Sequence, residues 1–574
     1  MTAPSNCIRA TTSNIADQDR LRTGRRRFIK AAGSGLLAAT LPGCAAPLMH
    51  RGRSLTAGQR VELLYLADTL ESLTPARIAA PATYLGPASL IGTPPWATAR
   101  SVATLANAPS QTWQSLTLPS ESAQRLSGGY GALAARLEQL RESLGSDRTL
   151  TLENGQCWNG SGLGHLSNGR AGVAASRLLG CDARVSSDER VLWPQQVAAL
   201  YRDYGQPVLG SLAPSQKDIG VVPASYFTRG GARVAVVGAT DPNAFDESRD
   251  LDVWYQALVK SVEQAAEQAD LVILLADTGS ASALWLAERL PAIDLVLAAR
   301  GLDFWPGLIE VARQDGRSVP LCLPGSHGMG CYQLSATSDQ DGWRFEARFH
   351  LTDNAAAGSA EFARAQQLQA RFNALRAPYT EWLDLRLATA PDWLWRRDTV
   401  GGTWDGLMAA ALAEGGEALS LLPGLRYDPL VAPGEPITRD HLLRLTGGHA
   451  AKVVSLQLDG ADLKRMVEDA IDNSIGTPLV INNSQDLPRL FGASWELRYG
   501  ADAGERALIN APAGTQRWLT FSAHPQAAGG EALWQRMERY LLAQQPALRL
   551  PPRPAIETRY LEGHPGWHPE SRLT

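Results

Sequence analysis

The stretch DLVILLADTGSASALWLAERLPAIDLVLAAR, Asp270 to Arg300, contains a strand, a helix and a second strand in direct succession. LVILL and LVL are short continuous apolar runs, which is the pattern of buried strands. ASALWLAERL, which lies between them, has the apolar spacing of an amphipathic helix. Strands that alternate with amphipathic helices predict a layered α/β sandwich.

The same alternation continues from Val61 to about Val311. Apolar or β-branched runs such as VELLYLAD, RTLTLENG and ARVAVVGA alternate with helical patterns such as GALAARLEQLRESL and VWYQALVKSVEQAAEQA. VPLCLPGSHG, GCYQLSA and RFEARFHLTD are then expected as closing strands. Residues 76–127, rich in Pro, Ala and Ser, predict a loop-rich insertion. An alanine-rich helix over 355–375 leads to a region that mixes helices with short strands, which predicts a second, α+β domain.

Length and charge limit the classes of function. A chain of 574 residues predicts two to four domains. It carries 54 Lys and Arg against 58 Asp and Glu, a net charge of -4. Residues 1–44 hold seven of the basic and two of the acidic residues, so 47 basic and 56 acidic residues remain, a net charge of -9. No basic patch interleaved with aromatic residues occurs, which argues against nucleic acid as a partner.

The N-terminal segment GRRRFIKAAGSGLLAATLPGC resembles a twin-arginine export signal, with Arg25 and Arg26 before a short apolar run. The resemblance implies passage through the twin-arginine translocase and a periplasmic location. Its end has two interpretations that stay open. Leu41 to Cys44 resembles a lipoprotein box, which would leave a lipid on Cys44, whereas cleavage after Ala46 would leave a protein without an anchor. No other segment is long and apolar enough to span a bilayer, so only such a lipid would tether the protein to a membrane.

Four further cysteines would meet an oxidising compartment. Cys322 and Cys331 flank LPGSHGMG, which allows a local disulfide, while Cys157 and Cys181 either pair or stay apart. A nucleophilic Cys157 would need a base that the sequence does not show, so a structural thiol is the favoured interpretation.

In a layered α/β fold, chemistry gathers in the tips, the residues that directly follow the carboxyl ends of the strands. Five tips follow one another here: LADTLES, NGQCWNGS, VSSDER, LADTGS and ARGLDFW. Together with PGSHGMG, PGLRYDP and LKRMVEDAIDN in the same order, they resemble the calcineurin-like metallophosphoesterases. Within that family they resemble the branch of periplasmic 5'-nucleotidases and the thiosulfohydrolase of bacterial sulfur oxidation. The resemblance covers nearly all of the mature chain and implies a four-layer α/β sandwich followed by a smaller α+β 5'-nucleotidase-type C-terminal domain.

The resemblance also implies boundaries. They are an export signal over 1–44, a linker over 45–58, a metallophosphoesterase-like domain over 59–352, a connecting helix over 353–378, a C-terminal domain over 379–560 and a tail over 561–574.

The family holds two divalent metals, such as manganese or zinc, on histidines and aspartates of these tips. In this chain most of the matching positions carry other side chains. The former metal-ligand positions are Asp68, Leu70, Gln156, Ser187, Asp277, Arg300 and Leu302. Asp68 and Asp277 are the two credible donors that remain, and two carboxylates do not hold two metals at ordinary affinity. The loop LTLENGQCWNGSGLG, Leu150 to Gly164, is therefore predicted to be a former metal site, and no metal or other cofactor is expected.

Arg300 suggests what replaced the metals. If the family geometry survives, its guanidinium lies within reach of Asp68 and Asp277 and neutralises them. The alternative is an Arg300 side chain that points to solvent. Three further residues are candidates for a ligand-binding cleft between the domains: His327 in a glycine turn, Arg426 as an anion anchor and Trp158 as a stacking platform. Their alternatives are a hydrogen-bonded turn residue, a surface ion pair and a packed core residue.

Three functions follow from these expectations. The first is a non-catalytic relative of the thiosulfohydrolase that binds the periplasmic sulfur-carrier protein, or another partner, through the interdomain cleft. The second is a residual or altered hydrolase of thiosulfonate or phosphate esters. The third is an envelope ligand-binding protein that kept only the architecture. Missing ligands favour the first and third, because metal-free activation of water would have to be rebuilt from a few side chains.

Overall fold

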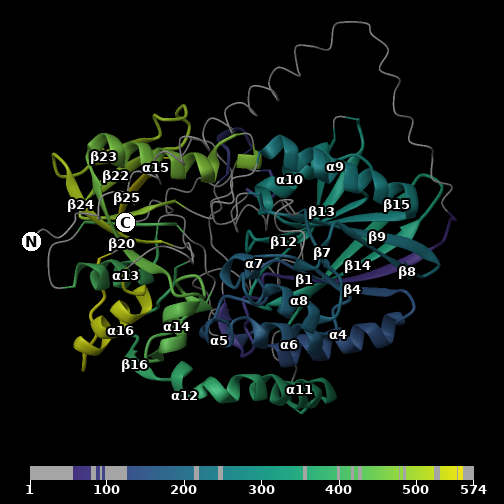
Figure 1. Cartoon of the computed structure of the whole chain (residues 1–574), viewed down its shortest axis with the longest axis horizontal. Coiled ribbons are helices and arrows are strands. Elements are labelled where there is room, and N and C mark those ends of the chain that lie inside the picture. Colours follow the sequence, from purple (N-terminus) through teal and green to yellow (C-terminus); the bar gives the residue numbers. More distant parts are fainter. Residues whose placement is uncertain are drawn as a thin grey trace, which may run out of the picture.

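The computed structural model describes residues 56–78, 86–90, 93–96, 126–211, 219–242, 250–313, 315–352, 358–396, 401–414, 419–424, 429–477, 479–481, 487–522, 530–552 and 554–559. It has the predicted mixed α/β architecture, in which a large N-terminal sandwich lies beside a smaller C-terminal part (Figure 1). The predicted export signal with Cys44, the linker up to residue 55 and the tail lie outside the described residues. Among the helices of the described ranges, none is long and apolar enough to cross a membrane.

Two sheets form the sandwich. The first has the spatial order β15 (Trp343–Leu351), β14 (Gly330–Ser338), β1 (Arg60–Ala67), β4 (Thr149–Asn154), β5 (Ala183–Val185), β6 (Val208–Leu209) and β7 (Val221–Val222). The second has the order β12 (Phe304–Ala312), β13 (Ser318–Pro324), β11 (Leu295–Ala299), β10 (Leu271–Asp277), β9 (Ala232–Thr240) and β8 (Ala224–Arg229). The β1–β4–β5–β6–β7 run and the β9–β10–β11–β13 run are parallel, so their carboxyl ends meet at common edges.

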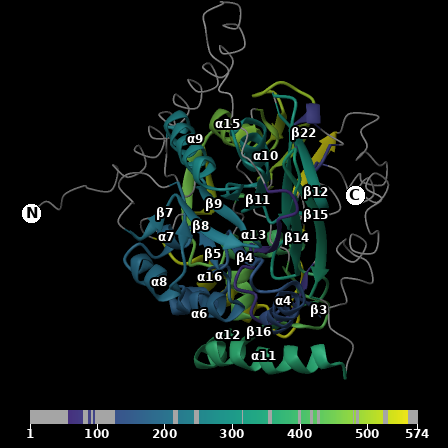
Figure 2. The same ribbon diagram turned by 90° about the vertical axis from the view of Figure 1, so that its right-hand side faces the viewer.

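Helices cover the outer faces of both sheets (Figure 2). The face of the first sheet carries α4 (Tyr130–Leu144), α5 (Gly162–Ser167), α6 (Arg170–Leu179), α7 (Glu189–Leu192) and α8 (Val197–Tyr204), and that of the second carries α9 (Leu251–Gln268) and α10 (Ser280–Arg289). Side chains of β1 point alternately into the two apolar cores that lie on either side of the first sheet. Leu63 and Tyr65 enter the core between the sheets, and Leu64 and Leu66 enter the core under the helices. The four layers predicted from the family resemblance are therefore present.

The opening stretch folds as its apolar pattern predicts. Its two runs form the adjacent parallel strands β10 and β11, and the segment between them forms α10. β10 is buried at every position, because it lies inside the sheet with apolar layers on both faces. This places Asp277 and Arg300, the residues that end β10 and follow β11, at one edge of the second sheet.

The structure decides a cysteine pairing that the sequence left open. The four described cysteines are free and buried. Cys322 lies in β13 of the second sheet and packs in the core between the sheets, whereas Cys331 lies in β14 of the first sheet and packs under the helices. These two cysteines therefore do not form the local disulfide that their spacing allows, because the two side chains enter different cores. Burial raises the pKa of the Cys157 thiol well above its usual value, which supports a structural thiol.

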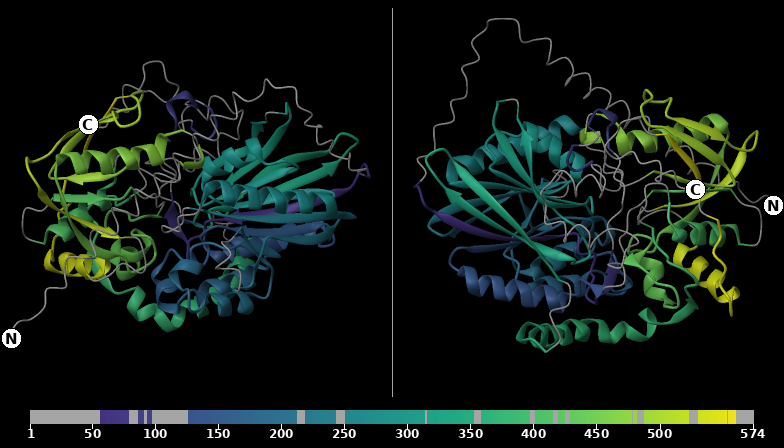
Figure 3. Two further views of the ribbon diagram at one scale, coloured as in Figure 1. Left: turned by 45° about the horizontal axis from the view of Figure 1, so that its top comes forward. Right: turned by 180° about the vertical axis from the view of Figure 1, so that it is seen from behind.

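A long helix, α11 (Ala360–Arg376), followed by η5 (Ala377–Tyr379) and α12 (Thr380–Leu383), leads along the base of the sandwich to the C-terminal part (Figure 3). The helices of that part are α13 (Thr403–Ala413), α14 (Arg439–Arg444), α15 (Gly460–Ile475), η6 (Leu479–Ile481) and α16 (Leu533–Ala543). Its strands are β16 (Arg386–Thr389) with β19 (Pro436–Thr438), then β20 (Lys452–Leu458), β24 (Gln516–Ser522), β17 (Leu419–Leu422) and β21 (Arg489–Phe491), and then β23 (Ala507–Asn510), β22 (Ser494–Arg498) and β25 (Ala555–Arg559).

The insertion after β1 contains more structure than its composition predicts. Its described residues include β2 (Ala76–Ile78), η1 (Ala88–Leu90) and β3 (Leu126–Ser127). β2 lies between β3 and β18 (Pro429–Leu430), a strand of the C-terminal part. A strand of the insertion thus joins regions that are more than 300 residues apart in the sequence, which no local pattern reveals.

Candidate site at the strand ends

The tips of both sheets meet around Asp68, the residue after β1. One carboxylate oxygen of Asp68 accepts a hydrogen bond from the backbone N–H of Gln156 (3.0 Å). The other oxygen accepts from the backbone N–H groups of Arg300 (2.7 Å) and Leu302 (3.3 Å). In addition, the carbonyl of Asp68 accepts from the N–H of His327 (2.8 Å). Asp68 therefore fixes three other loops by hydrogen bonds to their main chain.

Several side chains at this edge sit on left-handed backbone, an arrangement that costs free energy and that often marks present or former functional sites. Asp68, Leu70, Arg300, Leu302 and His327 have φ between 46° and 71°. Gly155 also has a positive φ, of 72°, and a Cβ at that position would lie 2.0 Å from a carboxylate oxygen of Asp68. The tight approach of the second tip to Asp68 thus depends on glycine.

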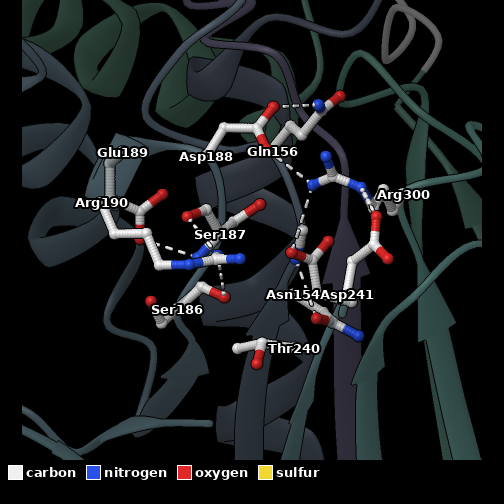
Figure 4. Close-up of polar contacts among 12 residues, drawn as sticks. Asn154, Gln156, Ser186, Ser187, Asp188, Glu189, Arg190, Thr240, Asp241 and Arg300 are labelled. Carbon is white, nitrogen blue, oxygen red and sulfur yellow. Dashed lines mark hydrogen bonds and ion pairs between the residues drawn. The ribbon is translucent and has the colours of Figure 1, made fainter. Parts of the chain in front are cut away.

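The Arg300 guanidinium lies among three aspartates from three different tips, two of which, Asp188 and Asp241, are labelled in Figure 4. Its Nη1 is 2.7 Å from a carboxylate oxygen of Asp188 and 3.6 Å from one of Asp277, and its Nε is 2.9 Å from one of Asp241. We call Arg300, Asp188, Asp241 and Asp277 the arginine cluster. The side chain of Arg300 is 14% exposed, and those of the three aspartates are between 0% and 6% exposed. Burial lowers the pKa of Arg300, but the aspartates more than reverse this, so the guanidinium stays charged.

The prediction that the Arg300 guanidinium lies within reach of Asp68 and Asp277 is confirmed for Asp277 and corrected for Asp68. Asp68 receives the backbone N–H of Arg300, while the guanidinium points toward Asp188, Asp241 and Asp277. The left-handed backbone at Arg300 turns its main chain toward Asp68 and its side chain to the other tips. The interpretation of an Arg300 that points to solvent is wrong as well.

Sequence reasoning missed two members of the arginine cluster. Asp188 belongs to the third tip, where the ligand pattern of the family points to Ser187 instead. Asp241 directly follows β9, whose tip is not among the five that carry the family resemblance. Their position after a buried strand is the signal that identifies both. Gln156 joins the cluster from the second tip, because its side-chain amide donates to Asp188.

Asp277 and Asp68 are buried carboxylates with raised pKa values. Burial raises the pKa of Asp277 to about 7, although Arg300 lowers it. The Ser187 hydroxyl, which is also fully buried, faces Asp277 and lowers its pKa as well. Burial likewise raises the pKa of Asp68 to about 7, with a further contribution from Asp277 and against the effect of its backbone N–H donors.

Leu70 and Leu302, two of the positions that the family resemblance assigns to metal ligands, belong to an apolar cluster of the C-terminal part. Each is 1% exposed, and the other buried members of that cluster lie between Leu387 and Leu548. Trp404, Met408 and Phe521 are examples of these residues. The first and fifth tips therefore pack against the apolar core of the second domain.

We expect Leu302→Ala to lower the free energy of unfolding by roughly 2 to 3 kcal/mol, because it removes buried methyl groups and leaves a cavity. This lies in the lower part of the usual range for truncation of a buried leucine. Urea unfolding at pH 7 measures the loss. Leu385→Ala is the control, because Leu385 is 42% exposed and its truncation leaves no cavity. Equal stabilities of the two variants would contradict the packing role of Leu302.

Trp158 does not line a cleft, which corrects the prediction. It is fully buried, and its indole N–H donates to the Ser176 hydroxyl (2.8 Å). The guanidinium of Arg184 lies 3.5 Å from the centroid of its ring. Arg184 is in turn paired with Glu153 (3.4 Å) and Glu189 (3.2 Å), all three without exposed surface. The Trp158 ring therefore packs against a second buried ion network, formed by Arg184, Glu153 and Glu189, beside the arginine cluster.

His327 is 1% exposed, and its Nδ1 lies 2.9 Å from the Ser326 hydroxyl oxygen. The backbone N–H of His327 also donates to the carbonyl of Asp68, so His327 is a hydrogen-bonded turn residue whose side chain is not open to a ligand. Arg426 lies outside the described residues. In the part of the chain that the structure describes, no three His, Cys, Asp or Glu side chains are grouped so that they would hold a metal ion.

Comparison with known proteins identifies the fold. No protein-family model matches the sequence, and no curated protein matches it. Among solved structures, sulfate thiohydrolase SoxB from Thermus thermophilus matches with a TM-score of 0.72 and 22% identity, over 88% of this chain and 97% of that chain. A 5'-nucleotidase precursor, also from Thermus thermophilus, matches with a TM-score of 0.64 and 15% identity, over 87% and 99%. A putative 5'-nucleotidase from Staphylococcus aureus matches with a TM-score of 0.52 and 14% identity, over 87% and 99%.

These matches extend over both domains of the solved structures. The chain therefore has the two-domain fold of the sulfate thiohydrolase and the 5'-nucleotidases, a metallophosphoesterase-like sandwich followed by a nucleotidase-type C-terminal domain.

Proposed function

We propose that this protein has lost the dinuclear metal site of its fold and acts in the periplasm as a non-catalytic binding partner in sulfur oxidation. The observation that carries the proposal is the Arg300 guanidinium, which lies among Asp188, Asp241 and Asp277 at the strand ends. A permanently charged side chain there supplies the positive charge that metal ions would otherwise bring.

The remaining donors do not fit two divalent cations. Both oxygens of Asp68 already accept backbone N–H groups, which orient them toward the main chain. Leu70 and Leu302 offer no donor and pack in an apolar cluster. Asp277 lies 3.6 Å from the Arg300 guanidinium, and a metal at that place would meet this positive charge.

The sulfur-carrier protein is the proposed partner because the solved structure with the highest TM-score given above is a sulfate thiohydrolase. The twin-arginine segment supports export to the periplasm, with either a lipid on Cys44 or no anchor. Since Leu70 and Leu302 are covered by the C-terminal part, we place the partner on the outer surface of the protein rather than at the strand ends. The alternatives are an altered hydrolase of thiosulfonate or phosphate esters and an envelope ligand-binding protein.

We expect manganese, zinc and iron to be near zero per chain in folded protein that was exported in metal-rich medium. Plasma mass spectrometry on the purified protein measures the content, and a nucleotidase with a complete ligand set, purified in the same way, is the control. One or two tightly held ions per chain would contradict the loss of the site.

Function itself is then tested with the carrier protein. Saturable binding in calorimetry, without hydrolysis of a thiosulfonate on the carrier, agrees with the proposal. Hydrolysis of thiosulfonate or phosphate esters by metal-free protein would instead establish the altered hydrolase. Absence of both would leave the envelope ligand-binding protein and refute the role in sulfur oxidation.

A further inference from the structure

The insertion after β1 contacts both domains by main-chain and side-chain bonds. β2 pairs with β18 in antiparallel register, with Arg77 opposite Leu430. The Arg77 guanidinium also pairs with Glu435 (3.0 Å). Four residues before β2, the Ser72 hydroxyl accepts a hydrogen bond from the Arg444 guanidinium of α14 (3.0 Å). The first tip is therefore continuous with a segment that is bonded to the C-terminal part.

A second anchor follows at residues 86–90 and 93–96. The hydroxyl of Tyr499, a residue of the C-terminal core, donates to the carbonyl of Gly86 and accepts from its N–H (3.2 Å). Ten residues later, Trp96 packs in the core between the two sheets of the sandwich. Gly86 leaves room for this ring, because a Cβ there would lie 2.0 Å from Trp96. The two ends of this short segment are thus anchored in the cores of different domains.

The main chains of the two domains touch at two glycines. A Cβ on Gly448 would lie 2.1 Å from the Cα of Gly160, which belongs to the second tip. The contact is reinforced where the N–H of Gly162 donates to a carboxylate oxygen of Asp440 in α14 (2.8 Å). Such an approach leaves no space for a side chain or a water molecule between the backbones. This close backbone contact therefore restricts the loop after α14 to one position relative to the second tip.

Each domain inserts apolar side chains into the core of the other domain. Leu70 and Leu302 of the tips belong to the core of the C-terminal part, whereas Val480 of η6 belongs to the core of the sandwich. The carbonyl of Val480 accepts a weak hydrogen bond from Ser282 of α10 (3.5 Å). Separation of the domains would expose apolar surface on both sides, which water disfavours.

We infer that these contacts form an interdomain lock, made of residues 70–77, 86–90 and 93–96, the Gly160–Gly448 contact and Val480, which holds the two domains in a single orientation. The lock keeps the arginine cluster covered and makes the protein one rigid body. Partner recognition then takes place on a surface of fixed shape, without a rotation of one domain against the other. This inference does not depend on the identity of the partner.

The test is a distance measurement by pulsed electron paramagnetic resonance between spin labels on Val253→Cys in α9 and Leu542→Cys in α16. These positions are 67% and 48% exposed, whereas the four cysteines of the described ranges are buried and less accessible to the reagent. We expect one narrow distance distribution, unchanged when the carrier protein is added. A broad or two-peaked distribution in the parent protein would overturn the lock, whatever its metal content or partner.

Gly448→Ala in the same labelled protein should broaden or shift the distribution, because the added methyl group meets Gly160. Gly434→Ala is the matched control. Gly448 and Gly434 have similar φ of 70° and 83°, so both substitutions carry the same backbone strain, but a Cβ on Gly434 meets nothing within 4 Å. A Gly448→Ala distribution as narrow as that of Gly434→Ala would refute the glycine contact. If Gly448→Ala does not fold, Tyr499→Phe takes its place, since it removes only the hydroxyl on Gly86.

Discussion

Arg300→Ala is expected to lower the free energy of unfolding by roughly 3 to 5 kcal/mol at pH 7.5, because it leaves buried carboxylates without their cation. Asp188, Asp241 and Asp277 are at most 6% exposed, so water cannot replace the guanidinium without a rearrangement of the tips. Urea unfolding of the variant and the parent measures the difference. The deficit should shrink at pH 5, because the pKa of Asp277 is raised to about 7 and this carboxylate is then protonated.

Arg317→Ala is the control for the Arg300 variant. Its guanidinium also pairs with an aspartate, Asp315 (2.7 Å), but it is 63% exposed. Exposed pairs contribute at most about 1 kcal/mol, so this variant should stay close to the parent. If Arg300→Ala unfolds at the same urea concentration as the parent, the guanidinium does not neutralise the site.

The second large effect is a decrease in stability as the pH rises. The folded protein raises the pKa values of Asp68 and Asp277 from 3.8 to about 7. Between about pH 4 and pH 7 the folded state therefore binds protons that the unfolded chain has released. Stability is fully present below pH 4 and is lost as the pH rises through 7. At 1.36 kcal/mol per unit for each group, and with the two groups coupled, we expect a loss of roughly 3 kcal/mol between pH 5 and pH 7.

The measurement is the free energy of unfolding in urea at several pH values from 4.5 to 8.5. Asp277→Asn is the diagnostic variant, because it removes one of the two buried groups whose pKa is raised to about 7. Its profile should have a smaller slope than that of the parent. A parent profile that instead rises from pH 5 to pH 7 would mean that both carboxylates are ionised in the folded state.

Three of the positions that the family resemblance assigns to metal ligands have clear packing or charge partners in the structure. Leu70 and Leu302 extend an apolar core, and Arg300 pairs with three carboxylates. Under the proposed function, an apolar contact and an internal cation are two different ways to fill a region without metal ions. The backbone is left-handed at all three positions.

The sequence by itself determined the layers. The buried run of β10, the helical spacing of α10 and the buried run of β11 are local patterns, and they fold as predicted because each needs only its own neighbours and a core to cover it. The order of the tips likewise follows from chain order alone. The domain boundaries and the export signal stay predictions.

Only the tertiary structure decided the partners of these residues. Asp241 reaches Arg300 across 59 residues of sequence, Leu302 enters a core formed mainly after residue 386, and Arg77 pairs with Glu435. Such contacts depend on how separate elements pack, and a side chain carries no local signal of which distant group it will meet. Arg300 is the clearest example. Its backbone is left-handed, its N–H donates to Asp68, and its guanidinium pairs with other aspartates, and the residue type alone indicates neither partner.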